Sequence, residues 1–183
     1  MPETQTNDLK DSVRANWHLG GSSADILFTE FEMVMMHFHQ AFERWVMHVM
    51  ARCGDSTLSF SECVFLHAIR LQGQPCNVQS LARQLNRDDI PNVQYSLRKL
   101  VKRGYLMHTH GNAKNHLFAL TEQGLQITDC YAKIRHTALV VQPPNIGAIQ
   151  DQMRLIIDAV GMLTGHYDES MRKAATYNFQ HLK

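Results

Sequence analysis

The feature that most constrains this sequence is a run of three short segments between residues 77 and 120. Asn77 is a candidate helix N-cap, and apolar residues follow it at the helical spacing i, i+3, i+4 and i+7 (Val78, Leu81, Ala82 and Leu85). A second helical pattern covers about 89–103 and ends at Gly104, a residue type that favours helix C-termini. The apolar period then changes to that of two short strands about a turn at 111–114, which predicts a hairpin.

Two short helices joined by a tight turn and followed by a hairpin are the elements of a winged helix-turn-helix, whose second helix enters the DNA major groove. The predicted second helix has its apolar residues on one side, and it carries no acid between Asn92 and Arg103. Amide and guanidinium groups can pair with base edges, whereas lysine mostly contacts phosphate. The base-edge candidates are Asn92, Gln94, Tyr95 and Arg98, and the phosphate candidates are Lys99, Lys102, Arg103 and, in the hairpin, His110, Asn112 and Lys114.

The charge distribution supports this reading, although the net charge of the 183-residue chain is only +1. Residues 83–116 hold seven basic and two acidic residues, a net charge of +5, whereas residues 1–82 carry −4 and residues 117–183 are neutral. The total charge argues against a protein that coats nucleic acid generally, as histones do. The local excess predicts a basic reading surface on a mildly acidic body.

Longer helices are predicted on both sides of this segment. Residues 24–52 contain no Gly or Pro, and their polar residues form a narrow stripe, which indicates a helix buried on two sides, most simply against a second copy of the chain. Ser59 and Glu62 form a capping box that opens a helix to about residue 72. Thr121 begins a helix to about residue 140, and an amphipathic helix follows Pro143 and Pro144, with a separate short helix expected after Tyr167.

We therefore expect a mainly α-helical protein with a winged helix-turn-helix domain. The expected parts are a flexible extension at 1–23, a dimerisation and core helix at 24–56, the DNA-binding domain at 57–121 and C-terminal dimerisation helices at 122–183. Since the sequence has no long apolar stretch and no signal-like start, a cytoplasmic protein without membrane contact is expected. The four cysteines show no CxxC pairing and predict reduced thiols, with Cys53 and Cys63 as buried thiols, not oxidation sensors.

Several motifs, in this order and spacing, resemble the MarR family of winged-helix regulators. They are residues 58–66, 81–85, 97–106 and 120–124, and the resemblance spans about residues 24–165. It implies a homodimer whose first and last helices intertwine and that binds a pseudo-palindromic operator, usually as a repressor released by a small ligand. Two features depart from the family pattern: the turn at 86–90 is one residue longer, and the wing lacks an Asp-x-Arg element, with Lys114 as the cation at its tip.

Other residues admit alternative interpretations. Five methionines in the first long helix predict an adaptable core and dimer seam. The alternative is an effector pocket with Trp45 and His67 in its wall, since members of the MarR family commonly bind aromatic anions. His108 and His110 share a strand face, with His116 placed opposite, so they could bind Zn²⁺. No Cys, Asp or Glu lies beside them, which favours contacts to phosphate, and no metal or other cofactor is expected.

The sequence contains no GxSxG, HExxH or glycine-rich phosphate loop, and this argues against an enzyme. A sequence-specific regulator that binds double-stranded DNA as a homodimer is the favoured function. The alternatives are a winged-helix dimer that binds only a protein partner and a metal-responsive regulator.

Overall fold

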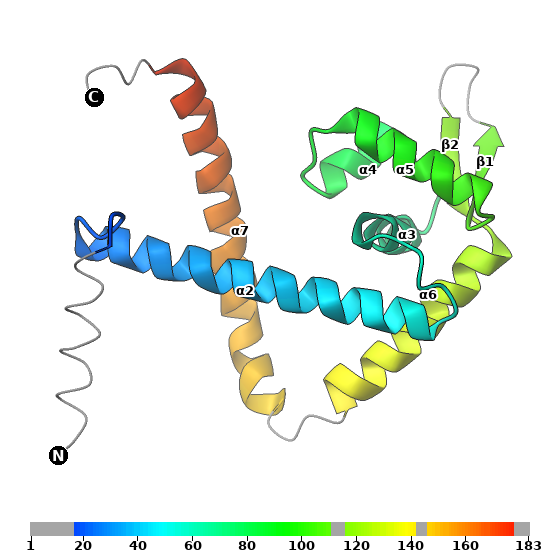
Figure 1. The fold of residues 1–183 in the computed structure, drawn as a ribbon, viewed down its shortest axis with the longest axis horizontal. Coiled ribbons are helices and arrows are strands. Elements are labelled where there is room, and N and C mark those ends of the chain that lie inside the picture. Colours follow the sequence, from blue (N-terminus) through cyan, green and yellow to red (C-terminus); the bar gives the residue numbers. More distant parts are fainter. Residues whose placement is uncertain (1–16, 111–115, 142–145, 178–183) are drawn as a thin grey trace. The chain divides into compact units, whose positions relative to one another are not determined.

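The computed structural model describes residues 17–110, 116–141 and 146–177, which belong to two compact units divided between Ile134 and Arg135. The first unit contains α2 (Ser23–Arg52), α3 (Phe60–Gln72), α4 (Val78–Gln84), α5 (Ile90–Lys102), β1 (Leu106–His110), β2 (His116–Leu120) and α6 (Glu122–Arg135), whose last residue lies at the division (Figure 1). The second contains a π-helical segment, His136–Val141, and α7 (Ile146–Thr176). The predicted mainly helical fold with a winged helix-turn-helix is confirmed. None of the helices in the described ranges combines the length and the apolar character that a membrane span requires.

Side-chain caps mark where three helices of the first unit begin. Ser22 caps α2 by accepting a hydrogen bond from the backbone N–H of Asp25. The predicted capping box opens α3, since the N–H of Ser59 donates to Glu62 Oε2 at 2.8 Å while Ser59 Oγ accepts from the N–H of Glu62. Asn77 Oδ1 accepts from the N–H of Ser80 at 2.7 Å and opens α4. These bonds satisfy helical N–H groups that have no partner within the helix.

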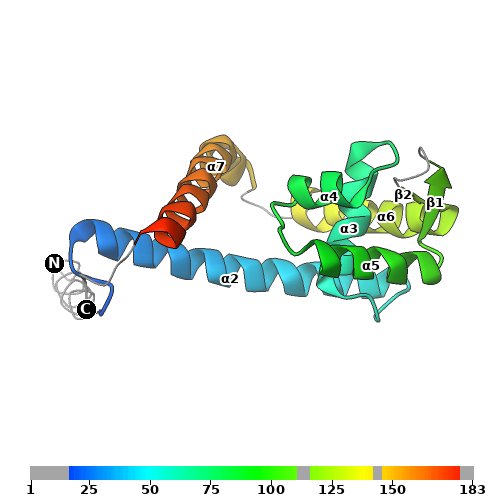
Figure 2. The same ribbon diagram turned by 90° about the horizontal axis from the view of Figure 1, so that it is seen from above.

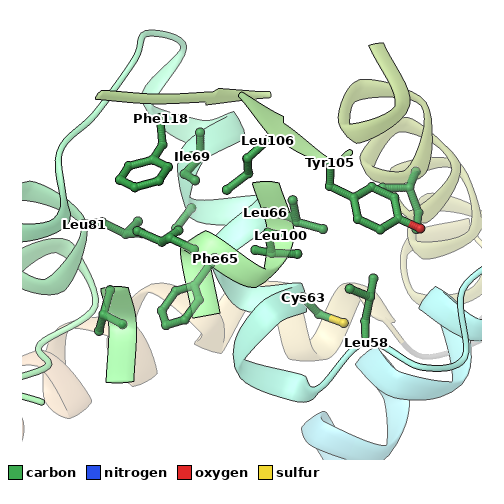
Figure 3. Packing of buried hydrophobic residues seen from close by; sticks show 14 of the residues in the cluster. Leu58, Cys63, Phe65, Leu66, Ile69, Leu81, Leu100, Tyr105, Leu106 and Phe118 are labelled. Carbon is green, nitrogen blue, oxygen red and sulfur yellow. The ribbon is translucent and has the colours of Figure 1, made fainter. Parts of the chain in front are cut away.

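The hydrophobic core of the first unit is built around α3, which contacts α2, α4, α5 and β2 (Figures 1 and 2). Large buried side chains from these elements and from β1 meet in one cluster, part of which is drawn in Figure 3. The cluster includes Met50, Phe65, Leu66, Leu81, Leu97, Leu100, Leu106 and Phe118. Because burying one such side chain stabilises the fold by about 1.5–3 kcal/mol, this cluster fixes α5 rigidly on the domain.

The wing is an antiparallel hairpin in which Leu106 pairs with Leu120 and His110 with His116. Cys76 extends it as a third strand position, because its N–H and C=O both bond to Phe118 of β2. The predicted hairpin is therefore confirmed, and its turn residues, 111–115, lie outside the described residues.

The start of α6 is locked onto the chain just after α5. Thr121 Oγ1 donates to the C=O of Gly104 at 2.5 Å and accepts from the N–H of Gly124 at 3.1 Å. A Cβ atom on Gly124 would lie 2.3 Å from the carbonyl oxygen of Tyr105, so only glycine allows this close approach.

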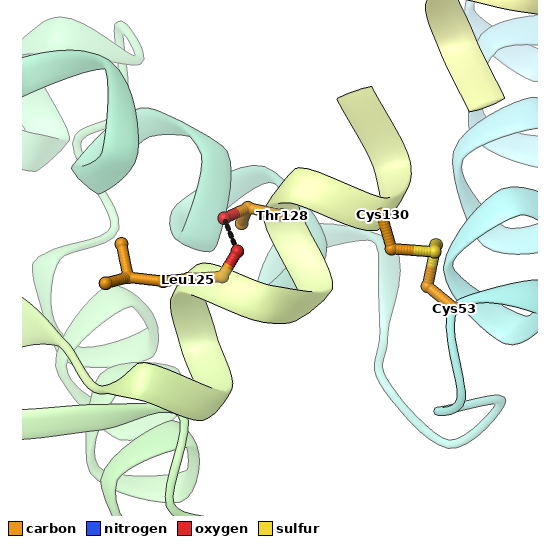
Figure 4. Close-up of a disulfide and its surroundings, with 4 residues drawn as sticks. All are labelled: Cys53, Leu125, Thr128 and Cys130. Carbon is orange, nitrogen blue, oxygen red and sulfur yellow. Dashed lines mark hydrogen bonds between the residues drawn. A yellow bond between two sulfur atoms is a disulfide. The ribbon is translucent and has the colours of Figure 1, made fainter. Parts of the chain in front are cut away.

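The prediction of four reduced cysteines is wrong for two of them. Cys53 and Cys130 form a disulfide with their Cα atoms 5.7 Å apart (Figure 4), whereas Cys63 and Cys76 are buried free thiols. Spacing could not reveal the pair, since its members are 77 residues apart and meet only where the end of α2 packs against α6.

The C-terminal helices also differ from expectation. The helix after Thr121 is α-helical only to Arg135 and continues as the π-helical segment to Val141. No separate helix follows Tyr167, because α7 runs without interruption from Ile146 to Thr176. Gly161 and Gly165 within α7 do not break it, since the cost of a single interior glycine, about 1 kcal/mol, is small for a long helix.

Candidate nucleic-acid interface

The second helix of the helix-turn-helix, α5, has one buried face and one exposed face. Val93, Leu97 and Leu100 are each 0% exposed and anchor the helix on the core. The opposite face presents the candidate base-reading residues to solvent, namely Asn92, Gln94, Tyr95 and Arg98, together with Lys102. The predicted separation of faces is therefore present, and it lies on the helix that enters the major groove in this class of fold.

Contacts within α5 orient part of its exposed face. Arg98 Nε lies 3.4 Å from the carbonyl oxygen of Gln94, one helical turn earlier, and Asn92 Nδ2 lies 3.4 Å from Asp89 Oδ2. Tyr95 is 66% exposed, so its ring is available to a ligand outside the domain. An exposed aromatic ring between amide and guanidinium groups is suited to a thymine methyl group or a phosphate.

Lys99 and Arg103 differ from the other candidates because they point at buried acids. Lys99 Nζ lies 2.8 Å from Glu62 Oε1, and Glu62 is only 2% exposed. Arg103 Nη2 lies 2.6 Å from Asp55 Oδ2, and its Nη1 lies 3.8 Å from Glu62 Oε2. These two cations therefore compensate charges inside the domain, and a phosphate would have to compete with the acids for them.

Asp55 is the centre of a hydrogen-bonded cluster at the end of α5. Its Oδ2 accepts from Tyr105 Oη at 2.7 Å as well as from Arg103, and its Oδ1 accepts from the backbone N–H of Thr57 at 2.8 Å. Burial would raise the pKa of Asp55, but these hydrogen bonds and the Arg103 charge outweigh it and hold that pKa at about 2. Burial and donation to Asp55 raise the pKa of Tyr105 to about 12.

In the turn before α5, an acidic residue pairs with one of the cations of the basic segment. Arg87 forms a two-pronged ion pair with Asp89, Nε donating to Oδ1 at 2.7 Å, while Nη1 donates to Ser61 Oγ at 3.3 Å. The hydrogen bonds from Arg87 lower the pKa of Asp89 to about 2, and the same bonds raise the pKa of Arg87. Within the described part of 83–116, ion pairs therefore engage Arg87, Lys99 and Arg103, but none of those found involves Arg83, Arg98 or Lys102.

Of the three candidate phosphate contacts in the wing, only His110 lies within the described residues. His110 is the last residue of β1, and Asn112 and Lys114 lie outside the described residues. The rings of His108 and His116 lie 5.5 Å apart in an edge-on arrangement. Among the described residues, no group of three or more His, Cys, Asp or Glu side chains is placed to hold a metal ion.

Trp45 and His67, the two candidate effector-site residues, both contact Tyr131 of α6. Trp45 Nε1 donates to Tyr131 Oη at 3.2 Å, and the His67 ring lies 4.3 Å from the Tyr131 ring. A hollow in the described part of the chain lies away from these three residues. It has a volume of about 300 Å³ and is lined at the end of α3 by Ile69, Arg70, Gly73, Gln74 and Pro75 and by residues of β2 and α6.

Sequence reasoning missed the acids that face the interface. The capping box identified Glu62, but it gave no sign that Lys99 and Arg103 contact that carboxylate. Asp55 carried no local signal, because its partners Arg103 and Tyr105 are about fifty residues later in the chain.

Comparison with known proteins agrees with this geometry. A family model described as a winged helix DNA-binding domain matches residues 58–124. No curated protein matches the sequence of the chain.

Three solved structures illustrate the similarity of the fold. One is a MarR-family transcriptional regulator from Rhodococcus sp. RHA1 (17% identity, TM-score 0.56, covering 73% of this chain and 94% of that one). Another is AbfR of Staphylococcus epidermidis, in the reduced form bound to DNA (14% identity, TM-score 0.63, covering 77% and 94%). The third is CouR from Rhodococcus jostii RHA1 bound to p-coumaroyl-CoA (17% identity, TM-score 0.54, covering 71% and 90%). The predicted resemblance to the MarR family is confirmed at the level of the fold and of its winged-helix domain.

Proposed function

Since this chain has the MarR-type fold and carries a winged-helix DNA-binding domain, we propose that it regulates transcription by binding double-stranded DNA sequence-specifically as a homodimer. The observation that carries the proposal is the exposed face of α5, where Asn92, Gln94, Tyr95 and Arg98 stand opposite a fully buried apolar face. These four side chains contact base edges in the major groove, and the two reading helices of the dimer recognise the halves of a pseudo-palindromic operator.

The cations divide into two groups in this proposal. Lys102 is exposed and contacts phosphate directly, as do His110, Asn112 and Lys114 of the wing. Lys99 and Arg103 contact phosphate by exchanging their carboxylate partners, Glu62 and Asp55, for the DNA backbone. Electrostatic affinity is therefore smaller than the local charge of +5 suggests, and base contacts supply a larger share.

The homodimer is supported by apolar side chains that each unit leaves exposed. In α2, Leu27, Val34 and Phe38 are 62–66% exposed, and in α7, Leu155 and Met162 are 72% and 75% exposed. Large apolar side chains that are exposed in such numbers are typical of an interface. We propose that the exposed apolar residues of α2 and those of α7 each pack against a second copy of the chain.

We further propose that the chain is a repressor released by a small ligand, and that it is not an enzyme and acts in the cytoplasm. Trp45 and His67 line the effector site, because both contact Tyr131 where α2, α3 and α6 meet. The ligand-bound structure of CouR, with p-coumaroyl-CoA, supports an effector role for this fold. An aromatic ligand would displace Tyr131 and shift α6 against the reading domain.

A selection of bound duplexes from a random-sequence pool tests the DNA-binding proposal. We expect enrichment of a two-fold symmetric site and a dissociation constant that rises with salt concentration. Sedimentation of the free chain should give a dimer. If no duplex is enriched and binding to random DNA shows no salt dependence, the chain is instead a winged-helix dimer for protein partners, and the proposal is wrong.

A further inference from the structure

The four cysteines form two chemically different classes. Cys53 and Cys130 are half-buried and bonded to each other (Figure 4). Cys63 and Cys76 are buried free thiols. Burial, together with the negative charges of Glu62 and Asp55, raises the pKa of Cys63 to about 12, and burial raises the pKa of Cys76. Because thiolates are the reactive species, these two thiols are inert at neutral pH and redox chemistry is confined to Cys53 and Cys130.

The disulfide is placed next to the cluster that holds the end of the reading helix. Cys53 directly follows α2, and Gly54 is the only residue between it and Asp55. Asp55 in turn accepts hydrogen bonds from Arg103, which follows α5, and from Tyr105. Residues 53–59 are here called the connector. Its Cys53 is bonded covalently to Cys130 of α6, and its Asp55 forms an ion pair with Arg103 at the end of α5.

We propose that Cys53 and Cys130 are a reversible dithiol–disulfide site, oxidised by hydroperoxides, that controls whether Asp55 holds Arg103 away from DNA. With the bond formed, the connector is fixed and Asp55 keeps the Arg103 guanidinium. With the bond reduced, the connector loses its covalent anchor and Arg103 becomes available to a phosphate. This coupling to DNA rests on the proposed function, whereas the thiol chemistry does not.

The location of a DNA-binding regulator supports reversibility. Such a protein works where the DNA is, and there cellular thiol systems keep most cysteines reduced, so a disulfide in that compartment is usually transient and regulatory. The Cα separation of 5.7 Å lies in the range that a disulfide requires, so the bond can close without a large backbone movement.

The proposed oxidation consumes one hydroperoxide for each disulfide formed. One thiolate attacks the peroxide oxygen, which forms a sulfenic acid and releases the alcohol after protonation. The thiolate of the other cysteine attacks the sulfenic sulfur, the S–S bond forms and hydroxide leaves as water. Two thiols and one hydroperoxide give one disulfide, one alcohol and one water, with two electrons passing from sulfur to oxygen. A dithiol reductant reverses the step by thiol–disulfide exchange.

Thiol counting on the folded full-length chain tests the chemistry. After reduction with dithiothreitol and removal of the reductant, one equivalent of cumene hydroperoxide should remove two of the four thiols, and peptide mapping should recover a Cys53–Cys130 crosslink within one chain. A variant carrying Cys63→Ala and Cys76→Ala should behave in the same way, and Cys53→Ser should form no crosslink. A bond that dithiothreitol cannot open in the folded chain, or that hydroperoxide does not restore, would overturn the proposal.

DNA-binding measurements test the coupling between the disulfide and Arg103. The probe is a duplex that the reduced chain has selected from a random pool. We expect the reduced chain to bind about tenfold more tightly than the oxidised chain, which is the value of one charge-assisted hydrogen bond. The slope of log affinity against log salt should steepen by about 0.9 per protomer on reduction. Oxidised Asp55→Asn should bind like the reduced wild type. Equal affinities, or tighter binding by the oxidised chain, would contradict the Arg103 route.

Hydrogen exchange without DNA separates this proposal from the proposed function. If neither redox form binds any duplex, the proposed function fails, but reduction should still speed amide exchange in the connector and at the end of α5. Cys130→Ser should show the faster exchange in both conditions. Unchanged exchange on reduction of the wild type would overturn the coupling by itself.

Discussion

Arg103, the residue that follows the reading helix α5, donates a hydrogen bond of 2.6 Å to Asp55, which lies in the connector between α2 and α3. The side chains of both are mostly buried, with 22% of Arg103 and 11% of Asp55 exposed. The pair joins the segment just before the winged-helix domain to the residue that follows the second helix of its helix-turn-helix. Arg103, which the sequence predicts as a phosphate contact, therefore stabilises the fold of the free protein through its ion pair with Asp55.

Asp55→Asn should lower the free energy of unfolding at neutral pH by about 1–3 kcal/mol, because Arg103 loses a charged acceptor. The effect should depend on pH. Since the pKa of Asp55 is about 2 in the folded chain and 3.8 ordinarily, its stabilisation is present above about pH 4 and is lost as pH falls towards 2. Denaturant unfolding between pH 2 and pH 7 should show the wild type and Asp55→Asn converging at the acid end. Parallel curves would contradict the charge-based account.

Arg98→Ala and Lys102→Ala should weaken DNA binding in different ways. In the proposed function Arg98 reads a base edge, so its loss should cost about 1–3 kcal/mol and relax the preference at one position of each half-site. Lys102→Ala should weaken all sequences equally and reduce the salt slope by about 0.9 per protomer. Competition binding with single-base operator variants measures both effects. An unchanged base preference in Arg98→Ala would exclude the base-reading role.

Gly124→Ala should destabilise the first unit by about 2 kcal/mol or more, because its methyl group would meet the Tyr105 carbonyl oxygen at 2.3 Å. Gly161→Ala in α7 is the matched control, since a Cβ there has nothing within 4 Å. That substitution should stabilise the helix by about 0.5–1 kcal/mol. Thermal unfolding of the two variants should shift in opposite directions, and a neutral Gly124→Ala would show that α6 does not pack tightly on the chain after α5.

Glu62→Gln should separate the two roles of the buried carboxylate. Glutamine can still accept the hydrogen bond from the N–H of Ser59, so the capping box survives, but Lys99 loses its charge partner. We expect a loss of about 2 kcal/mol for Glu62→Gln and about 1 kcal/mol more for Glu62→Ala, in which the cap is also removed. Equal losses in urea unfolding would mean that the capping bond contributes nothing measurable.

Cys53→Ser should lower stability only under oxidising conditions. The disulfide closes a loop of 77 residues and restricts the unfolded chain, which stabilises the fold by about 2–4 kcal/mol. Wild type and Cys53→Ser should therefore unfold at the same urea concentration in dithiothreitol and at different concentrations without it. A difference that persists in dithiothreitol would indicate that the serine itself disturbs packing at the end of α2.

The sequence alone determined where α3, α4 and α5 lie, because the signals for their ends are local, whereas the bounds of the C-terminal helices differ from the sequence prediction. Ser59 and Glu62, Asn77 and Gly104 act on backbone groups within a few residues, so their spacing predicted the ends of α3, α4 and α5 correctly. The two faces of α5 followed from its apolar period in the same way. These features are sufficient to identify a winged helix-turn-helix and the exposed face of its second helix.

Tertiary structure alone decided which of the predicted functional groups are available. Lys99 and Arg103 belong to the basic segment in sequence, but packing of α5 against α3 and the connector places them on Glu62 and Asp55. Cys53 and Cys130 carry no spacing signal and become partners only when α2 ends beside α6. Ion pairs and disulfides depend on distances between side chains from separate elements, and those distances exist only once the core has assembled.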